Sequence, residues 1–88
     1  MRLARVTGTV TATAKDSALV GGALLVVDFA DAAGTAVETG HVALDSCGAG
    51  VGDTVLISQG SAARLPQGKA AMPIDAVIVA IVEQVSTL

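Results

Sequence analysis

The sequence predicts an all-β fold, a small closed or nearly closed barrel of five short strands. β-Branched residues alternate with a period of two near the start, two later segments are apolar on both faces, and glycine or proline separates the short apolar runs. Alternation indicates a half-buried strand, and many short strands with turn signals between them are typical of barrels. No linker, repeat or low-complexity segment interrupts the chain, so we expect residues 1–88 to form a single domain.

The first expected strand covers residues 4–13, where small apolar residues alternate with arginine and threonine. Its predicted buried face consists of Ala4, Val6, Val10 and Ala12. A second strand is expected over residues 19–29, and the glycine pair at 21–22 predicts a bulge or a sharp bend. Because this second segment is apolar on both faces, we expect it to be covered by the core on one side and by a neighbouring subunit on the other.

Three further strands are expected over residues 37–45, 54–59 and 76–85. Gly34 is expected at the positive-φ position of the hairpin loop that precedes the first of them. One short helical turn is expected near residues 61–65, with Ser61 near its start. The last strand is again apolar on both faces over most of its length, which requires cover on both sides.

The composition independently predicts an oligomer. A chain of 88 residues buries a modest core and usually needs a disulfide, a metal or a partner subunit for support. Cys47 is the single cysteine, and no histidine cluster accompanies it. The chain is 52% hydrophobic and only 15% charged, against roughly 25% charged residues in typical soluble domains. We therefore expect part of its surface to face other chains.

Charge and aromatic content argue against nucleic acid and membrane partners. The net charge is −3 and the five basic residues are scattered, whereas phosphate binding needs clustered Lys and Arg. Phe29 is the single aromatic residue, which leaves no stacking platform for bases. The longest apolar run, residues 76–82, is far short of a membrane span, and no secretion signal is visible. We expect a cytosolic protein.

The segment with the most specific pattern is the glycine run Gly48-Ala49-Gly50-Val51-Gly52. It differs from a dinucleotide-binding fingerprint because its third glycine comes one residue early and a β-branched strand follows where a helix is required. Glycine permits positive φ and close backbone approach, so the run predicts a tight loop. We hypothesise that this loop lies near a subunit contact or a ring axis.

His41 and Cys47 are the residues that would serve as base and nucleophile in an enzyme, with Asp45 nearby. A catalytic pair requires hydrogen-bond contact, but in an extended strand these two residues lie about 20 Å apart at roughly 3.3 Å per residue. We expect Cys47 to be a small buried residue, and His41 to be an exposed strand residue or an intersubunit hydrogen-bonding group. No catalytic, metal or cofactor site is predicted.

Asp45, Asp53 and Asp75 all lie beside expected turns or strand starts. Aspartates there commonly accept hydrogen bonds from backbone N–H groups two residues further on. This explanation suffices for Asp53, whereas Asp75 is also a candidate partner for an arginine. Arg64 follows four small residues in a charge-poor region, where it is either solvated or bound to a carboxylate or carbonyl groups across a subunit boundary.

Three blocks of the chain, in order, follow a specific pattern. Residues 45–64, DSCGAGVGDTVLISQGSAAR, are similar to D-x-x-GAG-x-G-(D/E)-x-V-(L/I)…GS-(S/A)-AR. Residues 15–27 are similar to KD-x-x-L-x-G-x-x-LL-x-V, and residues 73–82 to P-(V/I)-D-A-A-I-V-G-I-V. With these blocks the chain resembles the EutN/CcmL family, the pentameric vertex proteins of bacterial microcompartment shells. The chain departs from the family at Ala23, where lysine is frequent, and at Ala80, where glycine is usual.

The resemblance implies an OB-like five-stranded barrel and a purely structural function. Such a protein would form a homopentameric ring that caps shell vertices beside hexameric shell proteins, in the bacterial cytoplasm, without catalysis or cofactor. A six-subunit ring is the less expected closure. The resemblance favours the interface interpretation of Arg64, and the interface or pore-loop candidates are Gly48, Ala49, Gly50, Gly52, Ser61, Arg64 and Asp75. The alternative functions are a small OB-fold module that binds a ligand or nucleic acid, and an enzyme built on Cys47, His41 and Asp45.

Overall fold

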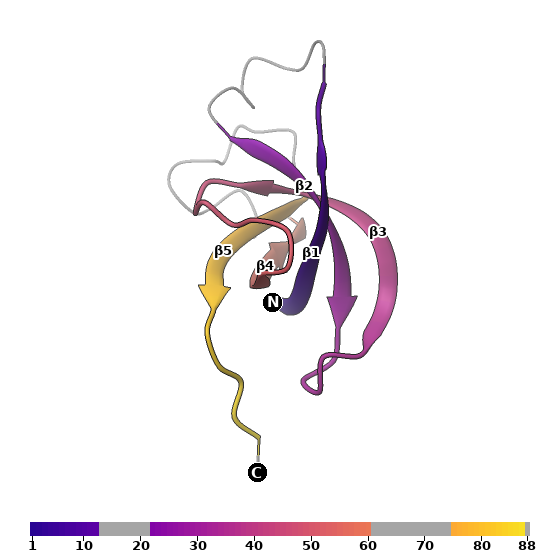
Figure 1. The fold of residues 1–88 in the computed structure, drawn as a ribbon, viewed down its shortest axis with the longest axis vertical. Helices are drawn as coiled ribbons and strands as arrows, with labels where there is room; N and C mark the ends of the chain where they lie inside the picture. The colour runs from indigo at the N-terminus through magenta and orange to yellow at the C-terminus, as the bar shows by residue number, and fades with distance from the viewer. Residues whose placement is uncertain (13–21, 61–74, 88) are drawn as a thin grey trace.

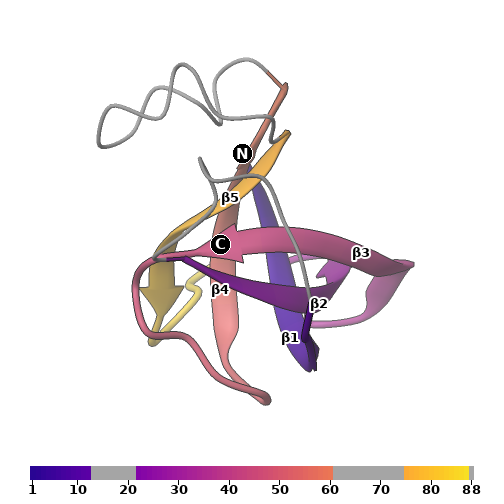
Figure 2. The same ribbon diagram turned by 90° about the horizontal axis from the view of Figure 1, so that it is seen from above.

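The structure is a computed structural model that describes residues 1–12, 22–60 and 75–87. Its five strands are β1 (Arg2–Val10), β2 (Ala23–Ala30), β3 (Ala36–Asp45), β4 (Thr54–Gln59) and β5 (Ala76–Val82). They form a closed barrel in the order β1-β2-β3-β5-β4, and β4 pairs back with β1 (Figures 1 and 2). The predicted all-β barrel is confirmed. The predicted helical turn near residues 61–65 lies outside the described residues.

All neighbouring strands are antiparallel except β3 and β5. These two strands run parallel and pair at two positions, Leu44 with Val77 and Asp45 with Ile78. The antiparallel neighbours share between four and seven residue pairs. The parallel junction is therefore the narrowest connection in the barrel wall among the described residues.

The strand boundaries follow from where each partner strand begins and ends. β4 coincides with its prediction. β5 ends at Val82, not at residue 85, because Val82 already pairs with Thr54, the first residue of β4. β1 ends at Val10, which pairs with Leu24 near the start of β2, so residues 11 and 12 have passed the end of that strand. Residue 13 and residues 19–21 of the predicted strands lie outside the described part.

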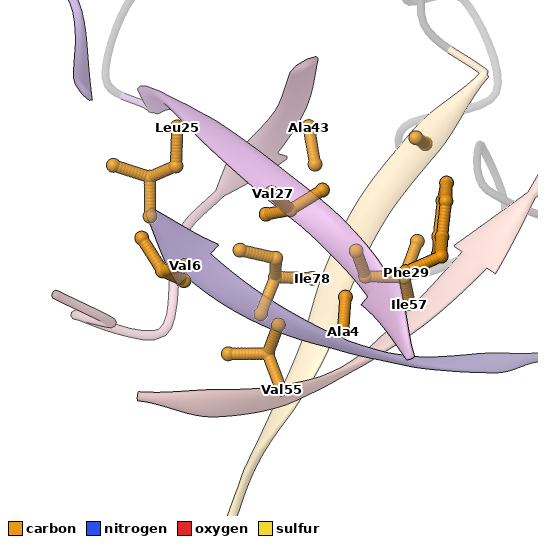
Figure 3. Close-up of a cluster of buried hydrophobic side chains, with 10 residues drawn as sticks. Ala4, Val6, Leu25, Val27, Phe29, Ala43, Val55, Ile57 and Ile78 are labelled. Carbon is orange, nitrogen blue, oxygen red and sulfur yellow. The ribbon is translucent and has the colours of Figure 1, made fainter. Parts of the chain in front are cut away.

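The core consists of the inward-facing residues of all five strands (Figure 3). It contains ten buried apolar residues, namely Ala4, Val6, Leu25, Val27, Phe29, Ala43, Val55, Ile57, Ala76 and Ile78. Alternate residues of a strand point to opposite faces, which explains why these positions are mostly two apart. Phe29 is fully buried in this cluster, so the single Phe of a chain without Tyr or Trp is used for packing.

A bulge in β1 corrects one sequence prediction. The pairing of β1 with β2 shifts by one residue between Val6 and Gly8, so the residues after the bulge exchange faces. Val10 was expected on the buried face with Ala4 and Val6, but it lies on the outside of the barrel and is 36% exposed. The glycine before β2 makes a bend as predicted, and a Cβ at Gly22 would lie 2.6 Å from Leu44 Cδ1.

Candidate subunit interface

The glycine loop, residues 46–53, connects β3 to β4 and is held by the carboxylate of Asp45. This side chain is 4% exposed and accepts three backbone N–H bonds, from Cys47 at 2.9 Å, Gly48 at 3.2 Å and Ala49 at 2.9 Å. Hydrogen bonds to an ionised acceptor are stronger than neutral ones, so this aspartate fixes the first half of the loop. The sequence predicted such a role for Asp45.

The second half of the loop is fixed by β1 and by Asp53. Gly52 N–H donates to the Val6 carbonyl, and Val6 N–H donates to the Asp53 carbonyl, both at 2.9 Å. The Asp53 carboxylate accepts the Gly50 N–H at 2.8 Å. The sequence prediction for Asp53 was therefore wrong in direction, because the carboxylate bonds three residues back along the chain and not two residues forward.

The three glycines of the loop differ in whether their backbone conformation requires glycine. Gly48 and Gly52 have φ angles of 83° and 95°, a region that side chains with a Cβ rarely adopt. Gly50 has no positive φ, and a Cβ placed on it would meet nothing within 4 Å. The predicted positive φ of Gly34 is likewise confirmed at 89°. Within one chain, neither conformation nor space requires glycine at position 50.

Two apolar faces lie on the outside of the barrel wall. The first, here the β1–β2–β3 face, consists of cross-strand neighbours that are half-buried or exposed, namely Gly8, Val10, Leu24, Val26 and Val42. The second, the β1–β4–β5 face, consists of the half-buried row Ala30, Leu3, Leu56 and Ala80, in which each residue pairs with the next. Leu3, before the bulge in β1, lies outside by simple alternation with Ala4, whereas the bulge turns Val10 to the outside.

The two polar residues of the hypothetical catalytic pair have separate partners. Cys47 was expected to be buried, but it is exposed and its thiol contacts the Ile78 carbonyl at 3.5 Å. Cys47 is exposed because it follows the end of β3, in the loop whose backbone is bound by the Asp45 carboxylate. His41 is half-exposed and its Nε2 lies 3.1 Å from a Glu38 carboxylate oxygen. It therefore bonds within its own subunit.

A polar cluster covers the Phe29 end of the core. The Arg2 guanidinium lies 3.9 Å from the centre of the Phe29 ring and 3.2 Å from the Glu38 carboxylate. The His41 ring lies 4.8 Å from the Phe29 ring, centre to centre. The hydrogen bond from Arg2, assisted by the charges of Arg2 and His41, lowers the pKa of Glu38 below its usual value. Sequence reasoning missed this cluster, since Arg2 and Phe29 are distant in the chain from each other and from Glu38 and His41.

The lowered pKa of Glu38 predicts a weak acid sensitivity. A carboxylate with a depressed folded-state pKa contributes stability that is present above its unfolded-state pKa and is lost as pH falls through the folded value. We expect Glu38→Gln to lose less thermal stability than the wild type between about pH 6 and about pH 3, by a small margin because the pair is exposed. Melting temperatures measured across this range test it, with Glu83→Gln as the control. An equal loss in the wild type and Glu38→Gln would contradict it.

The remaining interface candidates lie partly outside the described residues. Ser61 and Arg64 lie outside the described residues. Asp75 is exposed, and its carbonyl accepts the Gly60 N–H at 2.8 Å. In residues 1–12, 22–60 and 75–87 no helix is long and apolar enough to cross a membrane, and no group of three or more His, Cys, Asp or Glu side chains could hold a metal ion.

Comparison with known proteins decides the family. The family profile described as "Ethanolamine utilisation protein EutN/carboxysome" matches residues 1–83. The chain belongs to the EutN/CcmL family. It is 46% identical over 86 residues to the carboxysome shell vertex protein CcmL of Synechococcus elongatus, covering 98% of this chain and 87% of that protein. It is 39% identical over 85 residues to the microcompartment shell vertex protein EutN of Salmonella typhimurium, covering 97% and 86%.

Solved structures of the EutN/CcmL family have the same fold. The GrpN pentameric microcompartment shell protein from Rhodospirillum rubrum superposes with a TM-score of 0.88 at 39% identity, covering the whole of both chains. The resemblance found in the three sequence blocks is therefore confirmed over the full length. The CcmL and EutN relatives are both named as shell vertex proteins.

Proposed function

We propose that this protein is a structural shell protein, whose homopentameric ring caps the vertices of a bacterial microcompartment. Full-length similarity to shell vertex proteins and to a pentameric shell protein supports this function. The protein would act in the bacterial cytoplasm, within a shell and beside hexameric shell proteins, with no catalytic role and no cofactor. Its effect is geometric, because a flat sheet of hexagons needs pentagons to close.

The observation that carries the proposal is the pair of apolar faces on different parts of the barrel wall. A ring with cyclic symmetry and more than two copies uses a heterologous interface, in which one surface of a subunit meets a different surface of the next. The β1–β2–β3 face and the β1–β4–β5 face supply two such surfaces. In an 88-residue chain these faces are the apolar area that subunit association would remove from water.

The glycine loop is proposed as part of this contact, with Gly48, Ala49, Gly50 and Gly52. Ala49 packs against the core and joins the loop to the barrel. Gly50 is the informative member, because its open surroundings give no reason for glycine inside the subunit. A close approach by the backbone of a neighbouring copy would give one. Ser61, Arg64 and Asp75 stay in the proposed interface on the strength of the sequence pattern.

Substitution of Gly50 separates fold from assembly. In the isolated chain Gly50→Ala should leave stability unchanged or raise it by about 0.4–1 kcal/mol, because alanine restricts the unfolded chain. In the ring the added methyl should collide with the next copy, and we expect roughly tenfold weaker association. Thermal unfolding at a concentration where the ring is dissociated gives the first quantity, and native mass spectrometry over a dilution series gives the second.

Gly52→Ala is the matched control for this test. Gly52 has a φ of 95°, so a Cβ strains its backbone and should lower the stability of the single chain. Single-chain stability therefore separates the two variants, because Gly52→Ala should lower it and Gly50→Ala should not. Unchanged association of Gly50→Ala would remove position 50 from the proposed interface.

The position of Phe29 argues against the alternative function, an OB-fold module that binds nucleic acid. Phe29 is fully buried and the Arg2 guanidinium lies over its ring, so it offers no ring for a base to stack on. Native mass spectrometry of the protein at low micromolar concentration tests the proposed function. A five-subunit species supports it, a stable monomer contradicts the ring, and a six-subunit species contradicts the vertex geometry.

A further inference from the structure

Val51 is an exposed apolar side chain on a loop of fixed shape. It is 64% exposed, the most exposed large hydrophobic residue after Met1 among the described residues. The residues on both sides of it are held, Gly50 by Asp53 and Gly52 by the Val6 carbonyl. A side chain presented by a preorganised loop loses little conformational entropy when it binds, so this geometry suits a contact with another molecule.

An apolar pocket lies in the same region of the barrel surface. It has a volume of about 130 Å³, and its apolar border consists of Leu3 of β1, Ala30 of β2, Ala33 of the β2–β3 hairpin and Val85 of the C-terminal segment. Arg5, Asp31 and Thr54 also lie at its border. A cavity of about 150 Å³ lined by apolar side chains holds a benzene ring. The pocket therefore has room for the three-carbon side chain of a valine. Leu3 and Ala30 also belong to the β1–β4–β5 face, so the pocket is continuous with the proposed interface.

We propose that Val51 of one copy inserts into this pocket of the next copy, an inference that rests on the proposed ring. The loop and the pocket adjoin on one subunit, because Arg5 borders the pocket and its guanidinium donates to the Gly52 carbonyl at 3.4 Å. In a ring, the distance between equivalent points of successive copies shrinks toward the symmetry axis. Two patches that adjoin on one subunit can therefore meet across neighbouring copies only close to the axis. The Val51 contacts of all copies would then surround the axial opening.

Truncation of Val51 gives a quantitative test. Val51→Ser should leave the fold of the single chain unchanged, since the side chain is exposed, and should weaken association at least about tenfold in a dilution series. Val37→Ser is the matched control, because Val37 is also an exposed valine, at 56%, but lies outside the loop and the two faces. Equal association of the two variants would overturn the inference.

Disulfide trapping tests the location of the contact. In a Cys47→Ser background, Val51→Cys combined with Ala33→Cys should give covalent oligomers of up to five chains on oxidation, since a disulfide needs Cα atoms about 4.4–6.8 Å apart. Thr9→Cys with Ala33→Cys is the control and should give none. A five-subunit ring without covalent oligomers, or with a disulfide inside single chains only, overturns the Val51 contact and leaves the ring intact. A monomeric wild type overturns both proposals.

Discussion

Asp45→Ala is expected to lower the free energy of unfolding by about 3 kcal/mol. The substitution removes the acceptor of three backbone N–H groups, and hydrogen bonds to a charged group contribute about 1.5–3 kcal/mol each. The loss is smaller than their sum because the donors are only partly buried and water can reach them once the loop moves. Urea unfolding monitored by circular dichroism measures it, at one fixed protein concentration because oligomer stability depends on concentration.

Asp53→Ala is the control at the other end of the same loop. Asp53 is half-buried and its carboxylate accepts one N–H bond, from Gly50, so its removal should lower stability by about 1 kcal/mol. Asp45→Asn should fall between the two alanine variants, because the amide keeps one acceptor oxygen but turns an NH₂ group toward backbone donors. If Asp45→Ala and Asp53→Ala were equally stable, the loop would not depend on the buried carboxylate.

Val26→Glu is expected to abolish the ring while the barrel stays folded. Val26 is half-buried in the middle of the β1–β2–β3 face, opposite Gly8 and Val42. On the surface of a dissociated chain the carboxylate is hydrated, and stability should change by less than about 1 kcal/mol. Buried in a subunit contact without a partner, it would cost several kcal/mol, which corresponds to about a hundredfold or more in each association constant.

Val37→Glu provides the comparison for this second result. It places the same charge on an exposed valine of β3 outside both apolar faces, and the ring should persist. Size-exclusion chromatography with light scattering gives the subunit number of each variant, and circular dichroism reports whether the barrel is folded. A pentamer of Val26→Glu would remove the β1–β2–β3 face from the interface.

The fold was predictable because the barrel is built from local patterns. Alternation placed Ala4 and Val6 in the core, and the charge-poor composition predicted outward apolar faces such as that of Val26. One of the two errors has a non-local cause and the other a local one. Val10 changed faces through a bulge that only the pairing of β1 with β2 reveals, and Cys47 became exposed because the Asp45 carboxylate turns the chain outward.

Only part of the candidate site could be predicted from the sequence. The glycine run and its three glycines were found by pattern, but the difference between Gly50 and its neighbours requires backbone angles and the surrounding space. The pocket that we assign to Val51 joins residues from both ends of the chain, Leu3 and Val85, which no local pattern connects. The resemblance to vertex proteins named the function, whereas the surfaces that would perform it came from the pairing of the strands.

The narrow parallel junction between β3 and β5 bears on how a subunit deforms. Free energies of local opening vary across a structure, and regions held by few contacts open first. Two residue pairs, around Leu44 and Asp45, join these strands, whereas longer antiparallel ladders hold the rest of the wall. A load applied to the barrel wall would therefore be relieved at this seam. The β1–β2 ladder around Phe29 would keep its shape, and the barrel would act as a stiff block with one compliant joint.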